Sequence, residues 1–404
     1  MQKTHLIIGA SAAGLGALNT LRMLDHDAEI IGITDQKEYP YNTCWLADYA
    51  AGLKNRDQLC LLPPAKVEDK RIHLLRGRRV IDIMSTERRV QLDDGSTISY
   101  DTLLVATGTM PYVPSITNLE GPGVFPFHRL SDIDAIHAYI QQHAVKKLVV
   151  IGAGLSGLEA ADAFHHQGLQ VSVVERASSV LTGLFSGAAA TQIEIAMRNQ
   201  QVALYSNEMV VEIVRAHDGR PLGCRLASGT ELPADMIIFA VGVKPQLELL
   251  HKAGIVVGSQ GVAVDAHMQT TISGIYAAGD IIMAPDQLSG QLVPSRTWPD
   301  AMFQGLVAAH AMAGKEKRYP GLAVITSSAF FGLKVASCGY ANGFASSIDD
   351  LITVEKEGKH ATFALEQGRL RGFLIVGDCL QLTMLKKTLL TGALVEKERI
   401  LEGF

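Results

Sequence analysis

Residues 5–14 read HLIIGASAAG, and residues 148–157 read LVVIGAGLSG. Each copy of this pattern is a short apolar run that enters a turn of small residues and continues into an Ala/Leu-rich helical stretch. Each copy is followed by a second β-like run that ends in an acid, Asp35 in the first and Glu175 in the second. The repeat predicts two parallel βαβ units in one chain.

The small residues at the two turns match a chemical requirement. The pyrophosphate of a dinucleotide rests on backbone amides at the positive end of a helix, which it can approach only where side chains are small. The acid after the next strand accepts hydrogen bonds from the adenosine ribose. Asp35 and Glu175 follow the last glycine of their turns by 21 and 18 positions, close to the spacing for that role. The chain is therefore predicted to bind two dinucleotides. The candidate residues are Gly9, Ser11, Ala12, Gly14 and Asp35 in the first site and Gly152, Gly154, Gly157 and Glu175 in the second.

The composition excludes several other classes of protein. Of the 404 residues, 48% are apolar and 19% are charged, which suits two or three packed domains. The 36 Lys and Arg residues are outnumbered by 41 Asp and Glu residues, so no basic excess favours nucleic acid or an anionic membrane. Five scattered cysteines form no metal-binding motif and indicate a reducing, cytoplasmic setting. We expect no bound metal. Lys3 and the apolar run 6–18 resemble a short signal sequence or a weak membrane anchor, but the glycine turn explains the spacing of the glycines in this run better, and we expect no membrane span.

Three further segments resemble a known pattern in their order along the chain. One lies between the two glycine turns, and two lie after the second turn. Residues 101–108 read DTLLVATG, residues 239–245 read FAVGVKP, and residues 271–280 read TISGIYAAGD. Together with the two turns, they resemble the FAD-dependent pyridine-nucleotide oxidoreductases, the flavoproteins with two dinucleotide-binding domains. The resemblance covers most of the chain, and the last segment is its most specific motif.

This resemblance implies an α/β fold of two Rossmann-like dinucleotide-binding domains and a small α+β C-terminal domain. An FAD-binding domain of residues 1–112 and 242–320 is expected to be interrupted by an NAD(H)-binding domain of residues 113–241. Residues 321–404 are expected to form a C-terminal domain of the interface or dimerisation type. FAD is expected at the first turn and NADH at the second. Glu175 should repel the 2′-phosphate of NADPH, although the adjacent Arg176 could weaken that preference.

The resemblance also assigns roles outside the glycine turns. FAD-binding positions are implied at Thr107, Gly108, Gly279 and Asp280, with Gly242 at the return crossing and backbone contact between Val80 and the adenine. Lys37 lies either near the adenosine or toward solvent. Arg129 matches an arginine that approaches FAD, or else forms a surface salt bridge. Glu159 matches a position beside the nicotinamide, or else is a helix-surface glutamate.

The implied activity is that of an oxidoreductase in which NADH passes a hydride to the flavin, and two branches of the family compete for the acceptor. One interpretation depends on Cys44. Asn42 or Thr43 can cap a short helix, whose positive end would favour a thiolate at Cys44. This segment is similar to that of the single-cysteine members, which reduce disulfides, persulfides, peroxide or oxygen. The chain departs from their pattern at Trp45, where glycine is usual, and at Ala12, where the peroxidase and oxidase members carry histidine.

The other interpretation depends on residues 295–305, SRTWPDAMFQG. They resemble the helix that covers the flavin in rubredoxin and ferredoxin reductases and in the flavoprotein part of NADH nitrite reductases, and residues 331–339 and 372–378 are similar to the same branch. In those relatives an aromatic side chain lets electrons leave to a protein partner. Trp298 is the candidate for this role, unless it only packs under the helix. We favour this interpretation, with a redox protein or partner subunit as acceptor and a homodimer or heteromeric complex as the assembly. A ligand-sensing flavoprotein without turnover is a third class.

Overall fold

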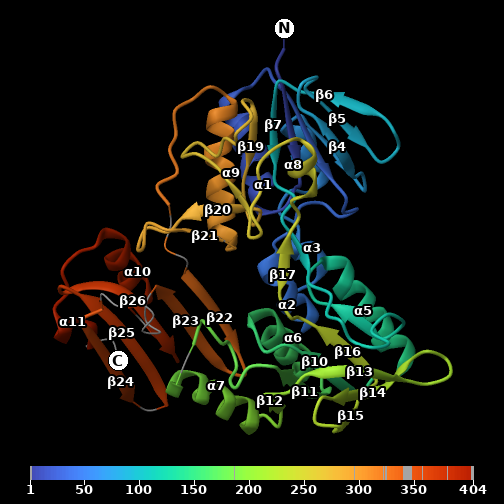
Figure 1. Ribbon diagram of the computed structural model, residues 1–404, viewed down its shortest axis with the longest axis vertical. Coiled ribbons are helices and arrows are strands. Elements are labelled where there is room, and N and C mark those ends of the chain that lie inside the picture. The colour runs from blue at the N-terminus through green and yellow to red at the C-terminus, as the bar shows by residue number, and fades with distance from the viewer. Residues whose placement is uncertain are drawn as a thin grey trace. The chain divides into compact units, whose positions relative to one another are not determined.

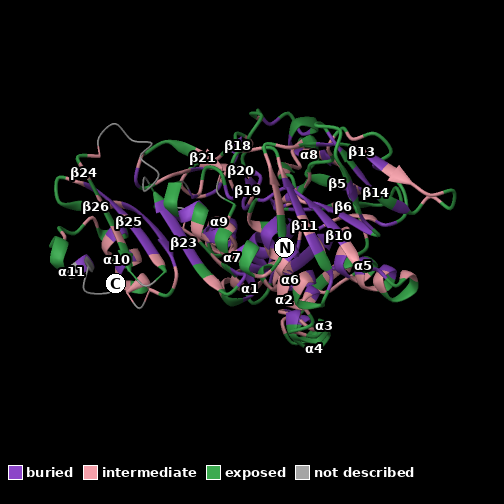
Figure 2. Cartoon of the chain, turned by 90° about the horizontal axis from the view of Figure 1, so that it is seen from below, coloured by how far each residue is buried: buried purple, intermediate pink, exposed green. Residues whose placement is uncertain are grey.

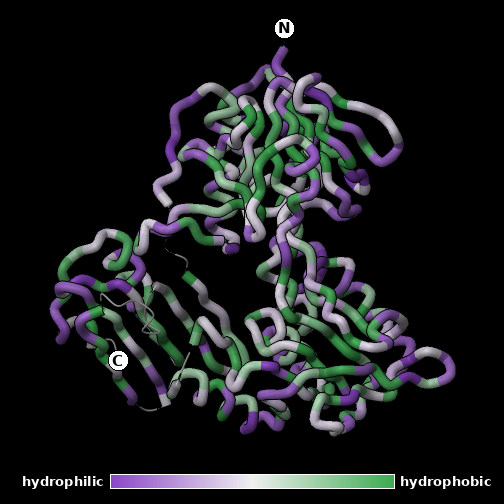
Figure 3. Tube along the Cα trace, in the orientation of Figure 1, coloured by the Kyte–Doolittle hydropathy of each residue, from purple (hydrophilic) through white to green (hydrophobic). Residues whose placement is uncertain are grey.

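Residues 2–185, 187–294, 296–321, 323, 325–339, 348–356, 358–379 and 381–401 are described by the computed structural model (Figure 1). The chain forms two compact units, each assembled from separate segments. Unit 1 comprises Met1–Trp45, Asn55–Met110 and Val243–Leu322. Unit 2 comprises Leu46–Lys54, Pro111–Gly242 and Ala323–Phe404. Hydrophobic residues are concentrated in the strands of both units, and the connecting loops are mostly hydrophilic (Figure 3).

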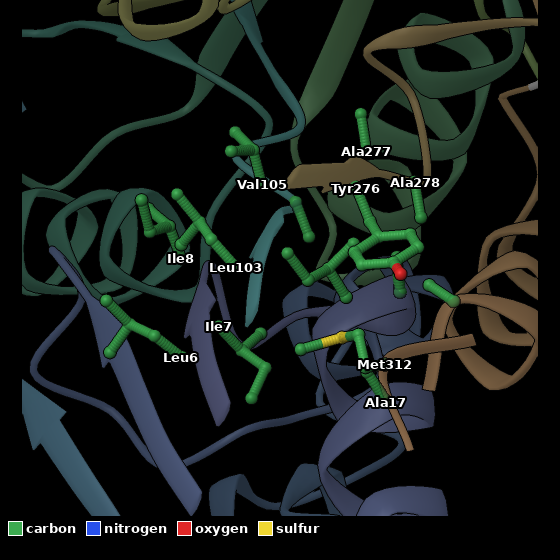
Figure 4. Packing of buried hydrophobic residues seen from close by; sticks show 14 of the residues in the cluster. Leu6, Ile7, Ile8, Ala17, Leu103, Val105, Tyr276, Ala277, Ala278 and Met312 are labelled. Atoms are coloured by element: carbon green, nitrogen blue, oxygen red, sulfur yellow. The ribbon is translucent and has the colours of Figure 1, made fainter. Parts of the chain in front are cut away.

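Unit 1 is built on a five-stranded parallel sheet in the order β19-β7-β1-β2-β3. Its strands are β1 (Thr4–Ile8), β2 (Glu29–Thr34), β3 (Ile72–Arg76), β7 (Thr102–Val105) and β19 (Ile275–Ala277). The central strands are continuous apolar runs, as expected for parallel strands that are buried on both faces. Ile7 of β1, Leu103 of β7 and Ala277 of β19 belong to one buried cluster, which Met312 extends (Figure 4).

Two helices pack closely in unit 1. They are α1 (Ala12–Leu24) and α9 (Trp298–Met312). A Cβ atom on Gly305 of α9 would lie 1.9 Å from the carbonyl oxygen of Ala13, and one on Gly16 of α1 would lie 2.4 Å from the carbonyl oxygen of Met302 on α9. Glycine is therefore required on both helices for this approach.

Unit 1 also contains short helices and small sheets, which connect the strands of the parallel sheet and the two long helices. The helices are η1 (Thr43–Trp45), α3 (Arg56–Leu59), α4 (Pro64–Asp69) and α8 (Glu248–Lys252). One antiparallel sheet contains β4 (Val80–Met84), β5 (Arg89–Leu92) and β6 (Thr97–Ser99). A mixed sheet contains β18 (Val262–Ala263), β20 (Ile282–Pro285) and β21 (Leu292–Pro294), and β8 (Thr109–Pro111) pairs with β17 (Val243–Pro245).

Unit 2 contains a second five-stranded parallel sheet, in the order β12-β11-β10-β16-β9. Its strands are β9 (Val124–Pro126), β10 (Lys147–Ile151), β11 (Gln170–Glu175), β12 (Ala203–Ser206) and β16 (Met236–Phe239). Its helices are α5 (Leu130–His143), α6 (Leu155–His166) and α7 (Gly187–Asn199). The antiparallel strands β13 (Val210–Arg215), β14 (Pro221–Leu226) and β15 (Glu231–Pro233) form a further sheet. Strand β10 is buried from residue 148 onward (Figure 2), which explains its uninterrupted apolar sequence.

The C-terminal part of unit 2 is a five-stranded antiparallel sheet in the order β22-β23-β26-β25-β24. The strands are β22 (Ile325–Phe330), β23 (Leu333–Gly339), β24 (Asp350–Lys356), β25 (Lys359–Glu366) and β26 (Arg369–Val376). Helices α10 (Leu382–Thr391) and α11 (Lys397–Leu401) follow. The predicted α/β class, with two parallel Rossmann-like sheets and a smaller α+β part, is confirmed.

Helix α2 (Leu46–Ala50) belongs to unit 2, although segments of unit 1 flank it in sequence. The hydroxyl of Tyr49 donates a hydrogen bond of 2.7 Å to Oδ1 of Asp134 on α5. Nε2 of His137, also on α5, lies 3.2 Å from the carbonyl oxygen of Ala50. These contacts attach α2 to the second parallel sheet's layer of helices. Across the described residues, no helix combines the length and the apolar character needed to cross a bilayer.

Candidate functional site

The first glycine turn joins β1 to α1 in unit 1. Gly9 has φ +99°, and a Cβ atom there would overlap the carbonyl oxygen of Ala106 at the end of β7. A Cβ atom on Gly14 would overlap the carbonyl oxygen of Gly9. Only glycine fits at either position, because one requires a left-handed backbone and both meet backbone atoms. The turn therefore brings the start of α1 directly onto the carboxyl ends of β1 and β7.

The start of α1 has the character of an anion site. Ser11 is the N-cap residue, with φ −81° and ψ −156°, and its side chain makes no capping hydrogen bond. Ala12 opens the helix and is buried. A helix end that its own cap does not occupy presents amide groups and a positive dipole to a phosphate. Ser11 and Ala12 therefore fit the pyrophosphate of a dinucleotide.

The predicted adenosine-side residues of unit 1 follow β2. Oδ2 of Asp35 lies 3.3 Å from Nη2 of Arg79. The carbonyl of Lys37 accepts a hydrogen bond from Arg76, whose guanidinium lies 3.7 Å above the ring of Tyr39. Val80 is buried at the start of β4.

A small surface cavity next to this segment is lined by Ala10, Ser11, Thr34, Gln36, Glu38, Tyr39, Pro40 and Tyr41. It joins the glycine turn to the chain that follows β2. Arg76 and Tyr39 were missed by sequence reasoning, because neither stands in a recognised motif.

The carboxyl ends of β7 and β19 carry the other FAD-site candidates. Oγ1 of Thr107 donates to the carbonyl of Gln246 at 3.0 Å, and Gly108 follows with φ +66°. Oγ1 of Thr109 donates to Oδ2 of Asp280 at 3.5 Å. Because β19, β7 and β1 are parallel neighbours, their carboxyl ends meet at one sheet edge. The structure therefore brings the first glycine turn, residues 107–108 and residues 279–280 together.

Asp280 is an acid in a mostly buried environment. Burial raises the pKa of its carboxyl, and the charge of Arg296 and the hydrogen bond from Thr109 oppose that rise. Gly279, immediately before it, has φ +81° and donates its amide to Oε1 of Gln304 at 2.7 Å. The Gly279–Asp280 turn is thus held by a side chain of α9.

The second glycine turn joins β10 to α6 in unit 2. Gly152 has φ +105°, and a Cβ atom there would lie 2.6 Å from the carbonyl oxygen of Ala240. A Cβ atom on Gly157 would overlap the carbonyl oxygen of Gly152. Gly154, the N-cap of α6, has φ −74°, and no described atom lies within 4 Å of where its Cβ would be. Gly152 and Gly157 are needed for packing, whereas Gly154 borders open space at a helix N-terminus.

Glu175 at the end of β11 faces this turn. Its Oε2 accepts the amide of Ala153 at 2.7 Å, and its Oε1 accepts the amide of Ala177 at 2.7 Å. Each carboxylate oxygen retains a second acceptor position, so the group is oriented and can still accept ribose hydroxyls. The arrangement fits the predicted ribose acid.

Glu159 lies on α6, two residues after Gly157. Oγ of Ser328 on β22 donates to its Oε1 at 2.6 Å. Burial raises the pKa of the Glu159 carboxyl, and the Ser328 bond opposes that rise. Asp162, on the next turn of α6, accepts a hydrogen bond from the backbone amide of Phe331. The β22–β23 hairpin is thus attached to the helix that starts at the second glycine turn, a contact that sequence reasoning missed.

The remaining candidates of unit 2, Arg129 and Gly242, take part in backbone hydrogen bonds. Arg129 is the N-cap of α5, and its amide donates to Oδ2 of Asp132 at 2.8 Å. Gly242 has φ +110°, and its carbonyl accepts the amide of Tyr112 at 2.9 Å. Arg129 and Glu159 therefore share a unit with the second glycine turn, and not with the first.

The two candidates for electron exit lie in unit 1. Cys44 is exposed on the three-residue helix η1, and its amide donates to Oδ1 of Asn42 at 3.0 Å. The predicted short helix is thus a 3₁₀ turn followed by the five-residue α2, which gives a smaller dipole than a long helix. Trp298 is the first residue of α9, partly buried and packed against the core of unit 1. Ser295, which begins the predicted segment, lies outside the described residues.

Each of the two units thus has a glycine turn at the carboxyl ends of its own parallel sheet, with an acid after the next strand. This geometry is typical of a dinucleotide-binding site. Residues 3–305 match the family described as pyridine nucleotide-disulphide oxidoreductase. The chain belongs to this family. Membership implies FAD and NAD(P)H as the two dinucleotides, and it makes the protein an oxidoreductase. The resemblance inferred from the sequence is confirmed.

Named relatives of this family differ in their acceptors. The chain is 34% identical over 324 residues to an NADH oxidase of Methanocaldococcus jannaschii, an alignment that covers 78% of the chain and 72% of the relative. It is 26% identical to a NAD-dependent persulfide reductase from A. fulgidus, with a TM-score of 0.90 over 97% of the chain and 77% of that chain. It is also 26% identical to a chain of the covalent putidaredoxin reductase–putidaredoxin complex, with a TM-score of 0.90 over 100% of the chain and 96% of that chain.

Proposed function

We propose that the protein takes a hydride from NADH through FAD and passes the electrons to a redox protein or a partner subunit. FAD would occupy the first glycine turn, with Asp35 at the ribose and Asp280 at the ribityl and pyrophosphate region. NADH would occupy the second turn, with Glu175 at the ribose and Glu159 beside the nicotinamide. When bound, the flavin accepts the hydride and can release the electrons singly, as protein acceptors require.

The remaining candidate residues keep their proposed roles. In unit 1 these are Lys37 and Val80 near the adenine nucleotide and Thr107, Gly108 and Gly279 along the FAD. In unit 2 they are Arg129 toward the FAD and Gly242 at the crossing. We also propose that residues 1–112 with 242–320, residues 113–241 and residues 321–404 act as three functional domains. The scattered cysteines support a cytoplasmic setting.

The observation that carries the choice of acceptor is the match to the putidaredoxin reductase chain, which extends over 100% of this chain and 96% of that one. Because the match extends over nearly the whole of a reductase from a complex with its protein partner, it supports a protein as the electron acceptor of this chain. The position of Trp298 at the head of α9 adds an aromatic side chain on the helix proposed to cover the flavin.

A second candidate function is reduction of a persulfide, disulfide or oxygen by Cys44. The exposure of Cys44 and the likeness to the persulfide reductase favour it. The short helices η1 and α2 weaken it, because they provide little positive potential to stabilise a thiolate.

Cys44→Ser is expected to leave NADH-dependent reduction of an iron–sulfur carrier within about twofold of the wild-type rate, since the proposed electron path does not use the thiol. Steady-state oxidation of NADH with a ferredoxin-type carrier, a disulfide, a persulfide and oxygen would measure it. Cys60→Ser is the matched control, because Cys60 is a partly buried thiol of the same unit. A loss of about 100-fold or more with every active acceptor would establish the thiol mechanism instead.

Glu175→Gln is expected to raise the dissociation constant of NADH about tenfold and to narrow the preference for NADH over NADPH. The amide cannot accept both backbone hydrogen bonds that the carboxylate accepts, and it no longer repels a 2′-phosphate. Titration with each nucleotide would measure the two constants. Glu231→Gln, an exposed acid of unit 2, is the control. Unchanged NADH affinity in Glu175→Gln would limit Glu175 to a role in the turn.

A further inference from the structure

A chain of buried polar side chains lies beneath the Gly279–Asp280 turn of unit 1. Gln304 accepts the Gly279 amide on Oε1 at 2.7 Å, and its Nε2 donates to the hydroxyl of Tyr319 at 3.3 Å. Tyr319 in turn donates to Oδ1 of Asp300 at 2.7 Å. Gln304 is 0% exposed, Asp300 3% and Tyr319 4%, so these bonds are shielded from bulk water.

The Gly279 amide at one end of this hydrogen-bonded series and the Asp300 carboxylate at the other determine which atom donates in each hydrogen bond. The Gly279 amide can only donate, so Gln304 must present its oxygen to the turn and its NH₂ group to Tyr319. Tyr319 therefore accepts from Gln304 and donates to the carboxylate of Asp300, which also receives a hydrogen bond from Gln304. Each member satisfies the next, and removal of one leaves a buried polar group without its partner.

The positions of these three side chains in the fold show which parts of unit 1 they connect. Asp300 and Gln304 are one turn apart on α9, which packs tightly on α1 through Gly305. Tyr319 lies on the segment that returns after α9, and its backbone amide donates to the carbonyl of Ala266 at 2.7 Å. The network thus connects helix α9 and the segment that carries Tyr319 to one peptide group, that of Gly279.

We propose that Asp300, Tyr319 and Gln304 form a positioning network that fixes the Gly279–Asp280 turn for FAD. This inference rests on the proposed function, which places FAD at that turn. The three residues act through the backbone of Gly279 and not by contact with the cofactor. A turn that is already held in its binding conformation loses less entropy when the cofactor binds.

The test compares two deletions of a buried hydroxyl in unit 1. Tyr319→Phe removes the hydroxyl that accepts from Gln304 and donates to Asp300. Tyr100→Phe is the matched control, because Tyr100 is 5% exposed and its hydroxyl has no hydrogen-bond partner within the described part of the chain. The dissociation constant of FAD is measured by flavin fluorescence on the full chain after reversible removal of bound flavin. We expect Tyr319→Phe to raise it about tenfold and Tyr100→Phe to leave it within about twofold.

A second pair of variants separates hydrogen bonding from simple packing. Asp300→Asn keeps an oxygen that can accept from Tyr319, whereas Asp300→Leu has a similar size and no acceptor. FAD affinity should stay within about threefold of wild type in Asp300→Asn and fall by about tenfold or more in Asp300→Leu. The affinity for NADH, which binds to unit 2 in the proposed function, should be unchanged in both. If Tyr319→Phe does not fold, this pair alone decides.

Equal FAD affinity in Tyr319→Phe and Tyr100→Phe would overturn the network, and so would equal affinity in Asp300→Asn and Asp300→Leu. A wild-type chain that binds no FAD after reconstitution would overturn the proposed function together with the network. The two failures are therefore distinguishable from the wild-type titration.

Discussion

Gly152→Ala is expected to destabilise the protein by more than about 3 kcal/mol, whereas Gly154→Val is expected to fold normally and bind pyridine nucleotide poorly. At Gly152 the backbone has φ +105°, and a Cβ atom would lie 2.6 Å from the carbonyl oxygen of Ala240. The added methyl group meets backbone at the end of β16, which cannot rotate away as a flexible side chain could. Strain from the left-handed conformation adds to the overlap.

Gly154 responds differently because its surroundings are open. Its φ of −74° suits any residue, and a Cβ atom there meets no described atom within 4 Å. The side chain of valine would instead occupy space at the head of α6, where the pyrophosphate is proposed to approach the backbone. We expect affinity to fall between about tenfold and about 100-fold, which corresponds to about 1.4–2.7 kcal/mol.

Thermal and urea unfolding, together with titration of NADH, would separate the two effects. Gly168→Ala, a positive-φ glycine of unit 2 with no described atom within 4 Å of its Cβ position, controls for backbone strain without overlap. A Gly154→Val variant that binds NADH as tightly as wild type would move the nucleotide site away from the head of α6.

Asp300→Asn is expected to remove a loss of stability that the wild-type protein suffers between about pH 4 and pH 6.5. Burial raises the pKa of the Asp300 carboxyl from 3.8 to about 6, and the nearby charge of Asp280 adds to the rise. The folded protein therefore holds this proton more tightly than the unfolded chain does. Below pH 3.8 the group is protonated in both states and costs nothing. As the pH rises to about 6, the unfolded chain ionises first and the folded state loses relative stability.

The size of this loss follows from the two pKa values. Their difference corresponds to about 3 kcal/mol, fully present above pH 6 and absent below pH 3.8. Urea unfolding of wild type and Asp300→Asn across this range would measure it, because the contributions of the groups that do not interact with Asp300 cancel in the difference. Glu68→Gln, an exposed acid of unit 1, is the control. A difference between wild type and Asp300→Asn that does not change with pH would show that Asp300 titrates normally.

The glycine turns and the sheets were predictable because their causes are local. A short apolar run, a turn of small residues and an acid at a set distance are read from neighbouring positions. The steric reasons for Gly9 and Gly152 were not readable in the same way. Each glycine meets a carbonyl from a strand that lies far along the chain, Ala106 in one case and Ala240 in the other.

The polar interior of unit 1 depended on distant residues and escaped sequence reasoning. Asp300 and Gln304 share one face of a helix that is otherwise rich in alanine and other apolar residues, a signal that could have marked them as buried. Tyr319 lies outside any motif, and its role appears only when the chain folds back after α9. The bond from Ser328 to Glu159 was hidden for the same reason, since 169 positions separate the two residues.

The placement of helix α2 has a practical consequence for dissecting the protein. A recombinant fragment in which residues 111–242 were joined to residues 323–404 by a flexible linker, without residues 46–54, would expose the side of α5 on which Asp134 and His137 hold Tyr49 and Ala50 in the full chain. Such a fragment is expected to be less stable than one that retains α2, because these hydrogen bonds are lost. A synthetic peptide of residues 46–54 added in trans, or the same residues attached to the fragment by a flexible tether, should restore its stability. The smallest segment of unit 2, Leu46–Lys54, thus lies in sequence between two segments of unit 1, and a fragment designed from one continuous stretch of unit 2 would omit it.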